Sequence, residues 1–219
     1  TPSFKKNQAA GNVVAVPLLE TLKHHKREVL IAVGAKFVET APFYIMSTFI
    51  VYYATKELGF SRTQALNAVT VATVVTTLLI PLMGALSDRI GRKTVYIAGV
   101  LMMMAYAFPY FWLLQTRSFS MLILATVIGL GVIWAPTTAV LGTMFSEIFK
   151  SNVRYTGITL GYQIGAALAG GTAPLVATFL LAKFDHSYVP IALYIIFTGL
   201  VSLVAIAAVS ERSGRQLDE

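Results

Sequence analysis

The sequence predicts an all-α membrane protein with six transmembrane helices, and three observations indicate this fold class. Of the 219 residues, 56% are hydrophobic and only 12% are charged, whereas soluble domains typically carry about 25% charged residues. The hydrophobic residues gather in six runs, each near or above the roughly 20 residues that a helix needs to cross a bilayer. These runs lack the polar–apolar alternation of membrane β-barrel strands, which excludes a barrel.

The six predicted spans are separated by short loops. They cover residues 29–54, 65–86, 94–114, 119–145, 156–182 and 188–209. A polar segment precedes them, and a short amphipathic helix on the membrane surface is predicted to start there at Pro17. The first residue is Thr1, so we expect the chain to be a segment of a longer protein. The predicted organisation is a central-loop segment (1–28), a transmembrane bundle (29–209) and a tail (210–219).

Basic residues gather on one side of the predicted spans. Twelve of the 17 lysine and arginine residues fall on that side, four fall on the other, and Lys36 lies inside a span. Because loops rich in lysine and arginine stay in the cytoplasm, both termini are predicted to be cytoplasmic, in a multi-pass protein of the plasma (inner) membrane. The cations form no basic face with interleaved aromatic residues, so the net charge of +7 does not indicate nucleic-acid binding.

A charged turn, Gly84-Ala-Leu-Ser-Asp-Arg-Ile-Gly-Arg-Lys93, joins the second and third spans. Its two glycines permit close packing and unusual backbone angles. A nucleotide-binding P-loop is excluded, because six residues separate Gly84 from Gly91, where a P-loop has four, and Arg92 intervenes before the lysine. Three cations predict that this turn is cytoplasmic.

The turn after the fourth span, residues 146–154, is predicted to lie at the same cytoplasmic mouth. Its charged residues could form an ion-pair cluster with those of the first turn. A cluster that forms in one conformation and breaks in another biases a two-state equilibrium. The candidate gating residues are Gly84, Asp88, Arg89, Gly91, Arg92, Glu147 and Arg154.

Two ionisable residues, Lys36 and Glu39, lie well inside the first span. Their three-residue spacing places them on one helical face. A charge inside the membrane costs at least about 2.5–3.5 kcal/mol on insertion scales, so it persists where it is paired or faces water. The pair could therefore hold the fold together. Alternatively it is a substrate-binding or proton-coupling site in a central cavity, where Glu39 binds the proton and Lys36 attracts an anion.

Other polar residues extend this candidate site. Tyr44 follows on the first span, and Tyr162 and Gln163 lie among the small residues of the fifth. These side chains could donate hydrogen bonds to a substrate, although interhelical hydrogen bonding is the alternative. Trp134 in the fourth span lies too deep for an interfacial aromatic belt, so it either lines a cavity or packs.

Small and helix-breaking residues shape the predicted bundle. In the fifth span, Gly157, Gly161 and Gly165 recur every four residues, which permits close approach by another helix. Proline tends to kink a helix, and bent helices suit a protein with an internal cavity. Five spans contain such a proline: Pro42, Pro81, Pro109, Pro136 and Pro174.

The sequence offers no support for catalysis. Cysteine is absent, and no H-E-x-x-H or G-x-S-x-G pattern occurs. Glu39 is the single carboxylate inside the predicted spans, so a two-carboxylate mechanism lacks its second member. The adjacent His24 and His25 are interpreted as loop residues, since they point to different sides of a helix and other metal ligands are absent nearby. We therefore expect no enzyme activity, no metal site and no cofactor.

Four segments share the pattern of one transporter family, and the resemblance extends over nearly the whole chain, from about Leu18 to Arg212. They are the G-x-x-x-D-R-x-G-R-K turn at 84–93, the segment Glu147–Gly157, Gly161-Tyr-Gln163, and Ala169-Gly-Gly-Thr-Ala-Pro174. The first resembles the signature loop of the major facilitator superfamily. Together the four look like the superfamily's metabolite:proton symporters, whose members transport small carboxylates or zwitterions.

The resemblance implies a twelve-helix fold of which this chain is the C-terminal six-helix half. The implied partners are a small-molecule substrate, a proton, the lipid bilayer and the missing N-terminal six-helix half, without which the chain should not transport. It also implies that Asp88 and Arg92 help lock the cytoplasmic gate and that Lys36 and Glu39 face the central cavity. Many relatives place arginine where this chain has Lys36, and lysine lacks the bidentate fork that suits carboxylates. The alternatives are an uncoupled facilitator or exporter of the same fold, or a non-transport membrane scaffold.

Overall fold

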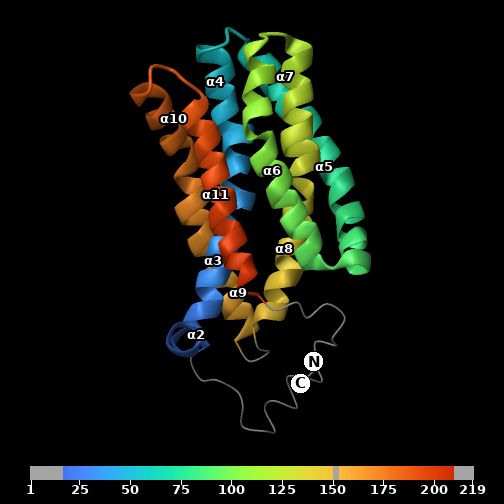
Figure 1. Ribbon diagram of the computed structural model, residues 1–219, viewed down its shortest axis with the longest axis vertical. Helices are drawn as coiled ribbons and strands as arrows, with labels where there is room; N and C mark the ends of the chain where they lie inside the picture. Colours follow the sequence, from blue (N-terminus) through green and yellow to red (C-terminus); the bar gives the residue numbers. More distant parts are fainter. Residues whose placement is uncertain (1–16, 150–152, 210–219) are drawn as a thin grey trace.

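The computed structural model describes residues 17–149 and 153–209, and the regular structure within them is helical. Six helical spans run side by side along the long axis of the molecule (Figure 1). The spans are Lys26–Lys56, Arg62–Ile90, Arg92–Gln115, Phe119–Ile148, Arg154–Lys183 and Val189–Ala207. All six are long and apolar enough to cross a membrane, so the predicted six-span, all-α fold is confirmed.

Three of the spans are continuous α-helices: α5 (Arg62–Ile90), α6 (Arg92–Gln115) and α11 (Val189–Ala207). A short helix, α2 (Pro17–His24), precedes the spans and packs against the first and fifth of them, which confirms the helix predicted from Pro17. The remainder of the predicted loop segment, residues 1–16, and the predicted tail, residues 210–219, lie outside the described residues.

The other three spans are each divided by a π-helical segment, which the sequence reasoning did not predict. The first consists of α3 (Lys26–Tyr44), π-helical Ile45–Phe49 and α4 (Ile50–Lys56). The fourth consists of α7 (Phe119–Thr126), π-helical Val127–Ile133 and α8 (Ala135–Ile148). The fifth consists of α9 (Arg154–Gly165), π-helical Ala166–Gly171 and α10 (Ala173–Lys183). Each segment lies beside a predicted proline kink, because Pro42 precedes the first, and Pro136 and Pro174 start the helices after the other two.

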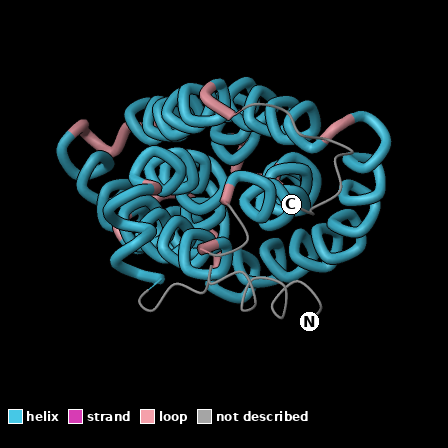
Figure 2. The backbone as a smooth tube through the Cα atoms, turned by 90° about the horizontal axis from the view of Figure 1, so that it is seen from below, coloured by secondary structure: helices cyan, strands magenta, loops and turns pink. Residues whose placement is uncertain are grey.

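The first span occupies the middle of the bundle. In its most apolar stretch 72% of the residues are buried, against 11% for α5, whose surface faces mostly outward. Helix α3 packs against α9 on one side and α11 on another. The view along the bundle shows the helices as closely packed rings (Figure 2). Most residues on α3 are therefore buried among the neighbouring helices.

The glycine face of α9 allows its close contact with α3. A Cβ atom added at Gly161 would collide with the Cβ of Ala32, and one added at Gly165 would lie 2.5 Å from the Cβ of Lys36. The prediction that these glycines permit close helix approach is confirmed. The approach also brings the polar side chains of α9 next to the charged residues of α3.

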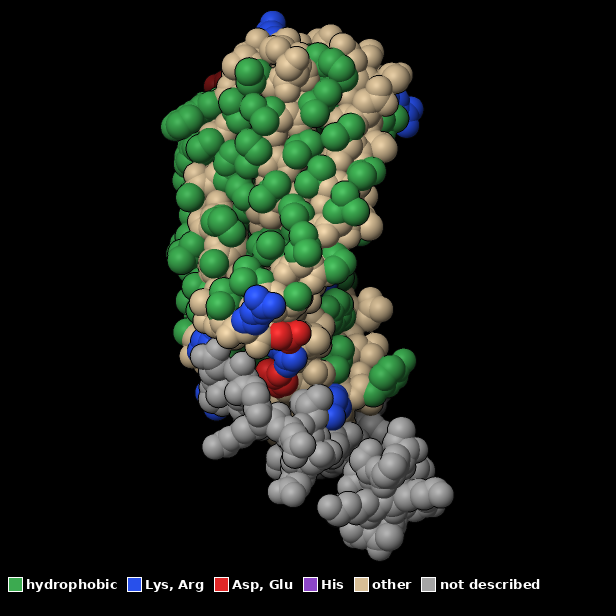
Figure 3. Space-filling view, turned by 90° about the vertical axis from the view of Figure 1, so that its right-hand side faces the viewer, with side chains coloured by type: hydrophobic (Ala, Val, Ile, Leu, Met, Phe, Trp, Pro, Cys, Tyr) green, Lys and Arg blue, Asp and Glu red, His purple; other side chains and the backbone are tan. Residues whose placement is uncertain are grey.

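Apart from Lys36 and Glu39 inside the first span, the described charged side chains lie toward the two ends of the molecule. On the face drawn in Figure 3, hydrophobic side chains cover the long middle section, and acidic and basic side chains gather below it. The α5–α6 turn, α2 and the start of α9 share this lower end in Figure 1, whereas the ends of α4 and α10 lie at the other. This distribution is the one expected of a bundle with its middle in hydrocarbon.

The predicted turn at 84–93 is much shorter than expected. Helix α5 continues to Ile90 and α6 starts at Arg92, so Gly91 is the only residue between them. The residues from Gly84 onward are compatible with a helix, and the Ser87 hydroxyl donates to the Gly84 carbonyl oxygen at 2.7 Å. The helix ends at Gly91, whose φ of 96° is a backbone conformation that favours glycine.

Candidate functional site

Lys36 and Glu39 form a buried ion pair on α3. The Lys36 Nζ lies 2.5 Å from the Glu39 Oε2, and the two side chains are only 8% and 9% exposed. The i,i+3 spacing puts both on one helical face, as predicted. Two opposite charges thus stabilise each other at a depth where either alone would be strongly unfavourable.

Hydrogen bonds from two more side chains complete the surroundings of the Glu39 carboxylate. The Thr40 hydroxyl donates to Oε2 at 2.7 Å, and the Thr138 hydroxyl from α8 donates to Oε1 at 3.2 Å. The Trp134 indole nitrogen, at the start of α8, donates to the Glu39 backbone oxygen at 2.5 Å. Both carboxylate oxygens therefore have a donor, and α8 is tied to α3 at this residue.

The Lys36 ammonium has a second partner on α9. It lies 4.1 Å from the centroid of the Tyr162 ring, which is a cation–π contact. The Tyr162 ring in turn packs edge-on against Phe145 of α8. Lys36 is thus held between an anionic and an aromatic partner from two helices, which fixes the ammonium at the wall of a cavity.

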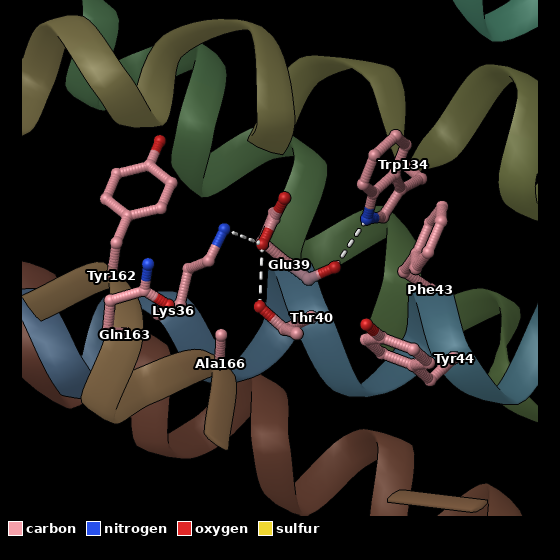
Figure 4. A pocket seen from close by; sticks show the side chains of 9 residues that line it. All are labelled: Lys36, Glu39, Thr40, Phe43, Tyr44, Trp134, Tyr162, Gln163 and Ala166. Carbon is pink, nitrogen blue, oxygen red and sulfur yellow. Dashed lines mark hydrogen bonds and ion pairs between the residues drawn. The ribbon is translucent and has the colours of Figure 1, made fainter. Parts of the chain in front are cut away.

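A cavity of about 300 Å³ opens beside this ion pair, a size suited to a small metabolite. Its lining comes from α3, the start of α8, α9 and the π-helical segment after α9. The lining residues are Lys36, Glu39, Thr40, Phe43, Tyr44, Trp134, Tyr162, Gln163 and Ala166 (Figure 4). All five residues predicted as substrate-binding or proton-coupling therefore line one cavity, namely Lys36, Glu39, Tyr44, Tyr162 and Gln163.

The cavity has two chemically different ends. Lys36, Tyr162 and Gln163 lie at one end, and Phe43, Tyr44 and Trp134 lie at the other, with Glu39 between them (Figure 4). Phe43 packs against Trp134 with 4.9 Å between ring centroids. A ligand with an anionic group could bind Lys36 at one end of the cavity. An apolar or cationic part of the same ligand could contact the aromatic rings at the other end.

The candidate gating residues form a partial cluster at the lower end of the bundle. Arg92, at the start of α6, pairs with Glu147 of α8 and lies 3.4 Å from Asp88 of α5. Arg154 departs from the predicted cluster, because its Nε donates to the Phe149 carbonyl oxygen at 3.3 Å and it pairs with no carboxylate among the described residues. Arg92 is therefore the centre of the cluster and links three helices.

Two further residues of the predicted turn have different surroundings. Arg89 lies exposed in the last turn of α5, where a cation complements the negative end of the helix dipole. A Cβ added at Gly84 would meet no atom within 4 Å, so the close packing predicted for this glycine is absent from the described part of the chain. The neighbouring Lys93, which was not predicted as a site residue, donates to the Val209 carbonyl oxygen at 2.6 Å and joins α6 to the end of α11.

Comparison with known protein families shows to which family the chain belongs. The family model described as Major Facilitator Superfamily matches residues 32–216, which is more than half of the chain. This chain belongs to the major facilitator superfamily. The predicted transporter-family fold is thereby confirmed, and the six spans make the chain a multi-pass membrane protein.

Curated members of the superfamily resemble the chain over most of its length. The ectoine/proline transporter ProP of Corynebacterium glutamicum is 30% identical over 99% of this chain and 45% of its own length. The shikimate transporter of Escherichia coli is 29% identical over 85% of this chain and 43% of its own length. The citrate-proton symporter of Klebsiella pneumoniae is 26% identical over 80% of this chain and 39% of its own length. No solved structure matches significantly.

The chain thus spans less than half the length of these curated relatives. Six helices are correspondingly one half of the twelve-helix fold that the sequence predicted. The relatives are metabolite transporters by their names, and one name states proton symport.

Sequence reasoning missed several residues that complete the site. Thr40, Phe43 and Ala166 were not among the predicted site residues, and Trp134 was assigned either to a cavity lining or to packing. The helical period could have found Thr40 and Phe43, since they lie four and seven residues after Lys36 and therefore share its helical face. The contacts of Trp134 and Thr138 depend on how α8 packs against α3, which no local pattern encodes.

Substitution of the two glycines of the α5–α6 region should have opposite effects on stability. Gly91→Ala places a Cβ on a residue with a φ of 96°, and we expect it to cost about 1–3 kcal/mol. Gly84→Ala fills open space within α5 and should stabilise the chain by about 0.5–1 kcal/mol. Thermal unfolding of the purified six-helix chain in detergent measures both. Equal effects of the two substitutions would contradict this account of the turn.

Proposed function

We propose that this chain is the C-terminal half of a proton symporter for a small organic carboxylate or zwitterion. In this proposal residues 1–28 are the end of the central cytoplasmic loop, residues 29–209 are the transmembrane bundle and residues 210–219 are the cytoplasmic tail. Both termini face the cytoplasm of a plasma (inner) membrane, because most lysine and arginine residues fall on that side. A second six-helix half is needed for transport.

The observation that carries the proposal is the Lys36–Glu39 ion pair in the wall of the cavity. A purely structural ion pair has no need of an adjacent cavity, whereas this one borders a space large enough for a metabolite. Protonation of Glu39 would weaken its hold on Lys36, and the freed ammonium could then bind a substrate carboxylate. Coupling follows if substrate and proton bind together. The proton on Glu39 frees Lys36 for the substrate carboxylate, and the bound substrate takes Lys36 away from Glu39, which favours protonation of Glu39.

The names of the relatives support this substrate class. They cover organic acids, in shikimate and citrate, and compounds of the ectoine and proline type. A common feature of these substrates is a carboxylate group, which a lysine ammonium can bind. Tyr44, Tyr162 and Gln163 supply further hydrogen-bonding groups at the cavity and are proposed as substrate contacts.

We also propose that the cluster around Arg92 acts as a gate at the cytoplasmic mouth. Its ion pairs to Asp88 and Glu147 link α5, α6 and α8 in the present conformation. Opening would require these contacts to break, which shifts the balance between two conformations. Gly84, Arg89 and Gly91 lie at the α5–α6 junction and would act through its movement, and Arg154 would act at the same mouth from the start of α9.

Substitutions in the full-length transporter test the proposed site. We expect Lys36→Ala and Glu39→Gln each to reduce substrate uptake by about 100-fold or more, the loss associated with a buried charge pair whose partner is removed. Glu39→Gln should also abolish the response to an imposed proton gradient. Tyr52→Phe, on the same span but outside the lining set, serves as the control. Unchanged uptake kinetics in both charge variants, at normal levels in the membrane, would refute the site.

A facilitator without proton coupling is the second candidate function. It is favoured by one observation: both oxygens of the Glu39 carboxylate already accept hydrogen bonds, and Lys36 neutralises its charge. A carboxylate held in this way can remain charged throughout the cycle. In that case Glu39→Gln would lower the stability of the protein, and uptake would equilibrate the substrate with or without a proton gradient.

A further inference from the structure

The part of α3 that carries the ion pair is held by a serine from α11. The Ser202 hydroxyl donates to the Gly34 carbonyl oxygen at 2.8 Å and accepts from the Val38 backbone N–H at 3.0 Å. These two backbone groups are four residues apart, so they are the pair that an α-helix joins directly. Ser202 is fully buried. Its hydroxyl therefore bridges one turn of the α3 backbone, and Lys36 lies within that turn.

A tyrosine from α6 binds the next carbonyl of the same turn. The Tyr96 hydroxyl donates to the Ala35 carbonyl oxygen, and Tyr96 is fully buried. In an α-helix this carbonyl accepts from the backbone N–H of Glu39. We call Tyr96 and Ser202 the clamp. Their hydroxyl groups bind the α3 backbone at Gly34 and Ala35, before Lys36, and at Val38, after it.

The clamp residue Ser202 lies where α11 approaches α3 unusually closely. A Cβ added at Gly34 would lie 2.7 Å from the Cβ of Ala205 on α11. The small residue lets α11 come near enough for Ser202 to reach the α3 backbone. Rotation of α3 at this level would therefore break both hydroxyl contacts and move Gly34 relative to α11.

The backbone of α3 is weaker than usual just beyond the clamp. Pro42 has no N–H, so the Val38 carbonyl lacks the donor four residues later. The π-helical segment Ile45–Phe49 follows within one turn. Residues 34–42 therefore form a short helical segment between the clamp contacts at its start and Pro42 at its end. The orientation of this segment depends on side chains from neighbouring helices.

We propose that Tyr96 and Ser202 are positioning residues that hold the 34–42 segment in the orientation where Lys36 and Glu39 meet at the cavity. This inference rests on the proposed function of the ion pair. Neither clamp residue lines the substrate cavity, and both hold α3 through hydrogen bonds to its backbone atoms. It acts on the site by setting the rotation of the helix that presents it.

Four variants of the full-length, reconstituted transporter test the clamp. Tyr96→Phe and Ser202→Ala delete its hydroxyls, and Ser202→Thr retains one. Tyr106→Phe is a matched control, because the Tyr106 hydroxyl on the same α6 binds a carbonyl of α7, that of Ala125, at 3.2 Å. The measurements are amide hydrogen exchange in the 34–42 segment and the KM and Vmax of uptake.

The expected result separates positioning from general stability. Tyr96→Phe and Ser202→Ala should speed amide exchange in the 34–42 segment by about tenfold and raise KM by about three- to tenfold, the scale of one lost buried hydrogen bond. Vmax should change by less than about twofold, Ser202→Thr should restore KM, and Tyr106→Phe should leave both quantities unchanged.

Two results would overturn the inference. Unchanged exchange in the 34–42 segment would mean that the clamp does not hold it, and faster exchange without a change in KM would mean that the clamp serves packing alone. Absence of gradient-driven uptake by the unsubstituted transporter would instead refute proton coupling, and the exchange comparison and KM would still decide the clamp. If no uptake occurs at all, the exchange comparison alone decides whether the segment is held.

Discussion

Replacement of Lys36 by methionine is expected to destabilise the chain by about 3 kcal/mol, at the lower end of the range for a broken buried ion pair. The substitution keeps most of the side-chain volume and leaves the Glu39 carboxylate without a cation. The carboxylate is only 9% exposed, so water compensates little. The hydrogen bonds from Thr40 and Thr138 remain and limit the loss. Thermal or denaturant unfolding of the six-helix chain in detergent gives the value.

The double variant Lys36→Met/Glu39→Gln distinguishes a charge effect from a packing effect. It contains no uncompensated charge, so we expect it to regain at least about half of the stability that the single variant loses. Transport by the full-length protein should remain abolished in both, because neither has the pair. If the double variant were as unstable as Lys36→Met, the loss would come from packing, and the electrostatic account of the pair would be wrong.

Substitution of Gly165 by alanine is also expected to destabilise the chain, with a net cost of up to about 2 kcal/mol. The added Cβ would lie 2.5 Å from the Lys36 Cβ and 3.1 Å from the Val33 carbonyl oxygen, so α9 and α3 must separate. Overpacking of this kind typically costs about 1–3 kcal/mol. Alanine is about 1 kcal/mol better than glycine inside a helix, which offsets part of the loss.

Gly171→Ala is the matched control for Gly165→Ala. It lies in the same span, and a Cβ added there would meet no atom within 4 Å. We expect it to be neutral or stabilising. Uptake by the full-length transporter should fall in Gly165→Ala, because Lys36 is displaced from Tyr162 and from the cavity. Equal unfolding free energies for the two variants would show that α9 does not depend on this contact.

The sequence predicts the fold because membrane spans follow from local hydrophobicity alone. The predicted limits of all six spans lie within four residues of the observed helices. The contact between Lys36 and Glu39 is equally local, since helical geometry brings residues three apart together. The glycine repeat of the fifth span also predicted a close contact, although it did not identify α3 as the partner.

Features that depend on tertiary packing were not predictable in this way. Thr138 and Trp134 reach Glu39 only because α8 lies against α3, and Ser202 lies 168 positions after Gly34 in the chain. The extent of the 84–93 turn was misjudged because charged residues were taken to end a helix. At a membrane boundary they extend α5 as far as Gly91, where the backbone angle stops it.

The π-helical segments are a second feature that the sequence did not predict. The prolines beside them indicated bends, but proline alone does not specify whether a helix kinks or widens by one residue. All three segments border the cavity, since Tyr44 directly precedes the first, Trp134 directly follows the second and Ala166 starts the third. Such segments often occur at functional sites, and here they bring side chains of three spans to one space.

The most direct test of the central claim is uptake by the full-length transporter in reconstituted vesicles. A panel of labelled carboxylates and zwitterions is offered with and without an inward proton gradient. The account predicts that one compound accumulates against its own gradient only when the proton gradient is imposed, and that Glu39→Gln abolishes this accumulation. Equilibration of the compound regardless of the proton gradient would contradict coupling, and would leave Glu39 as the structural partner of Lys36.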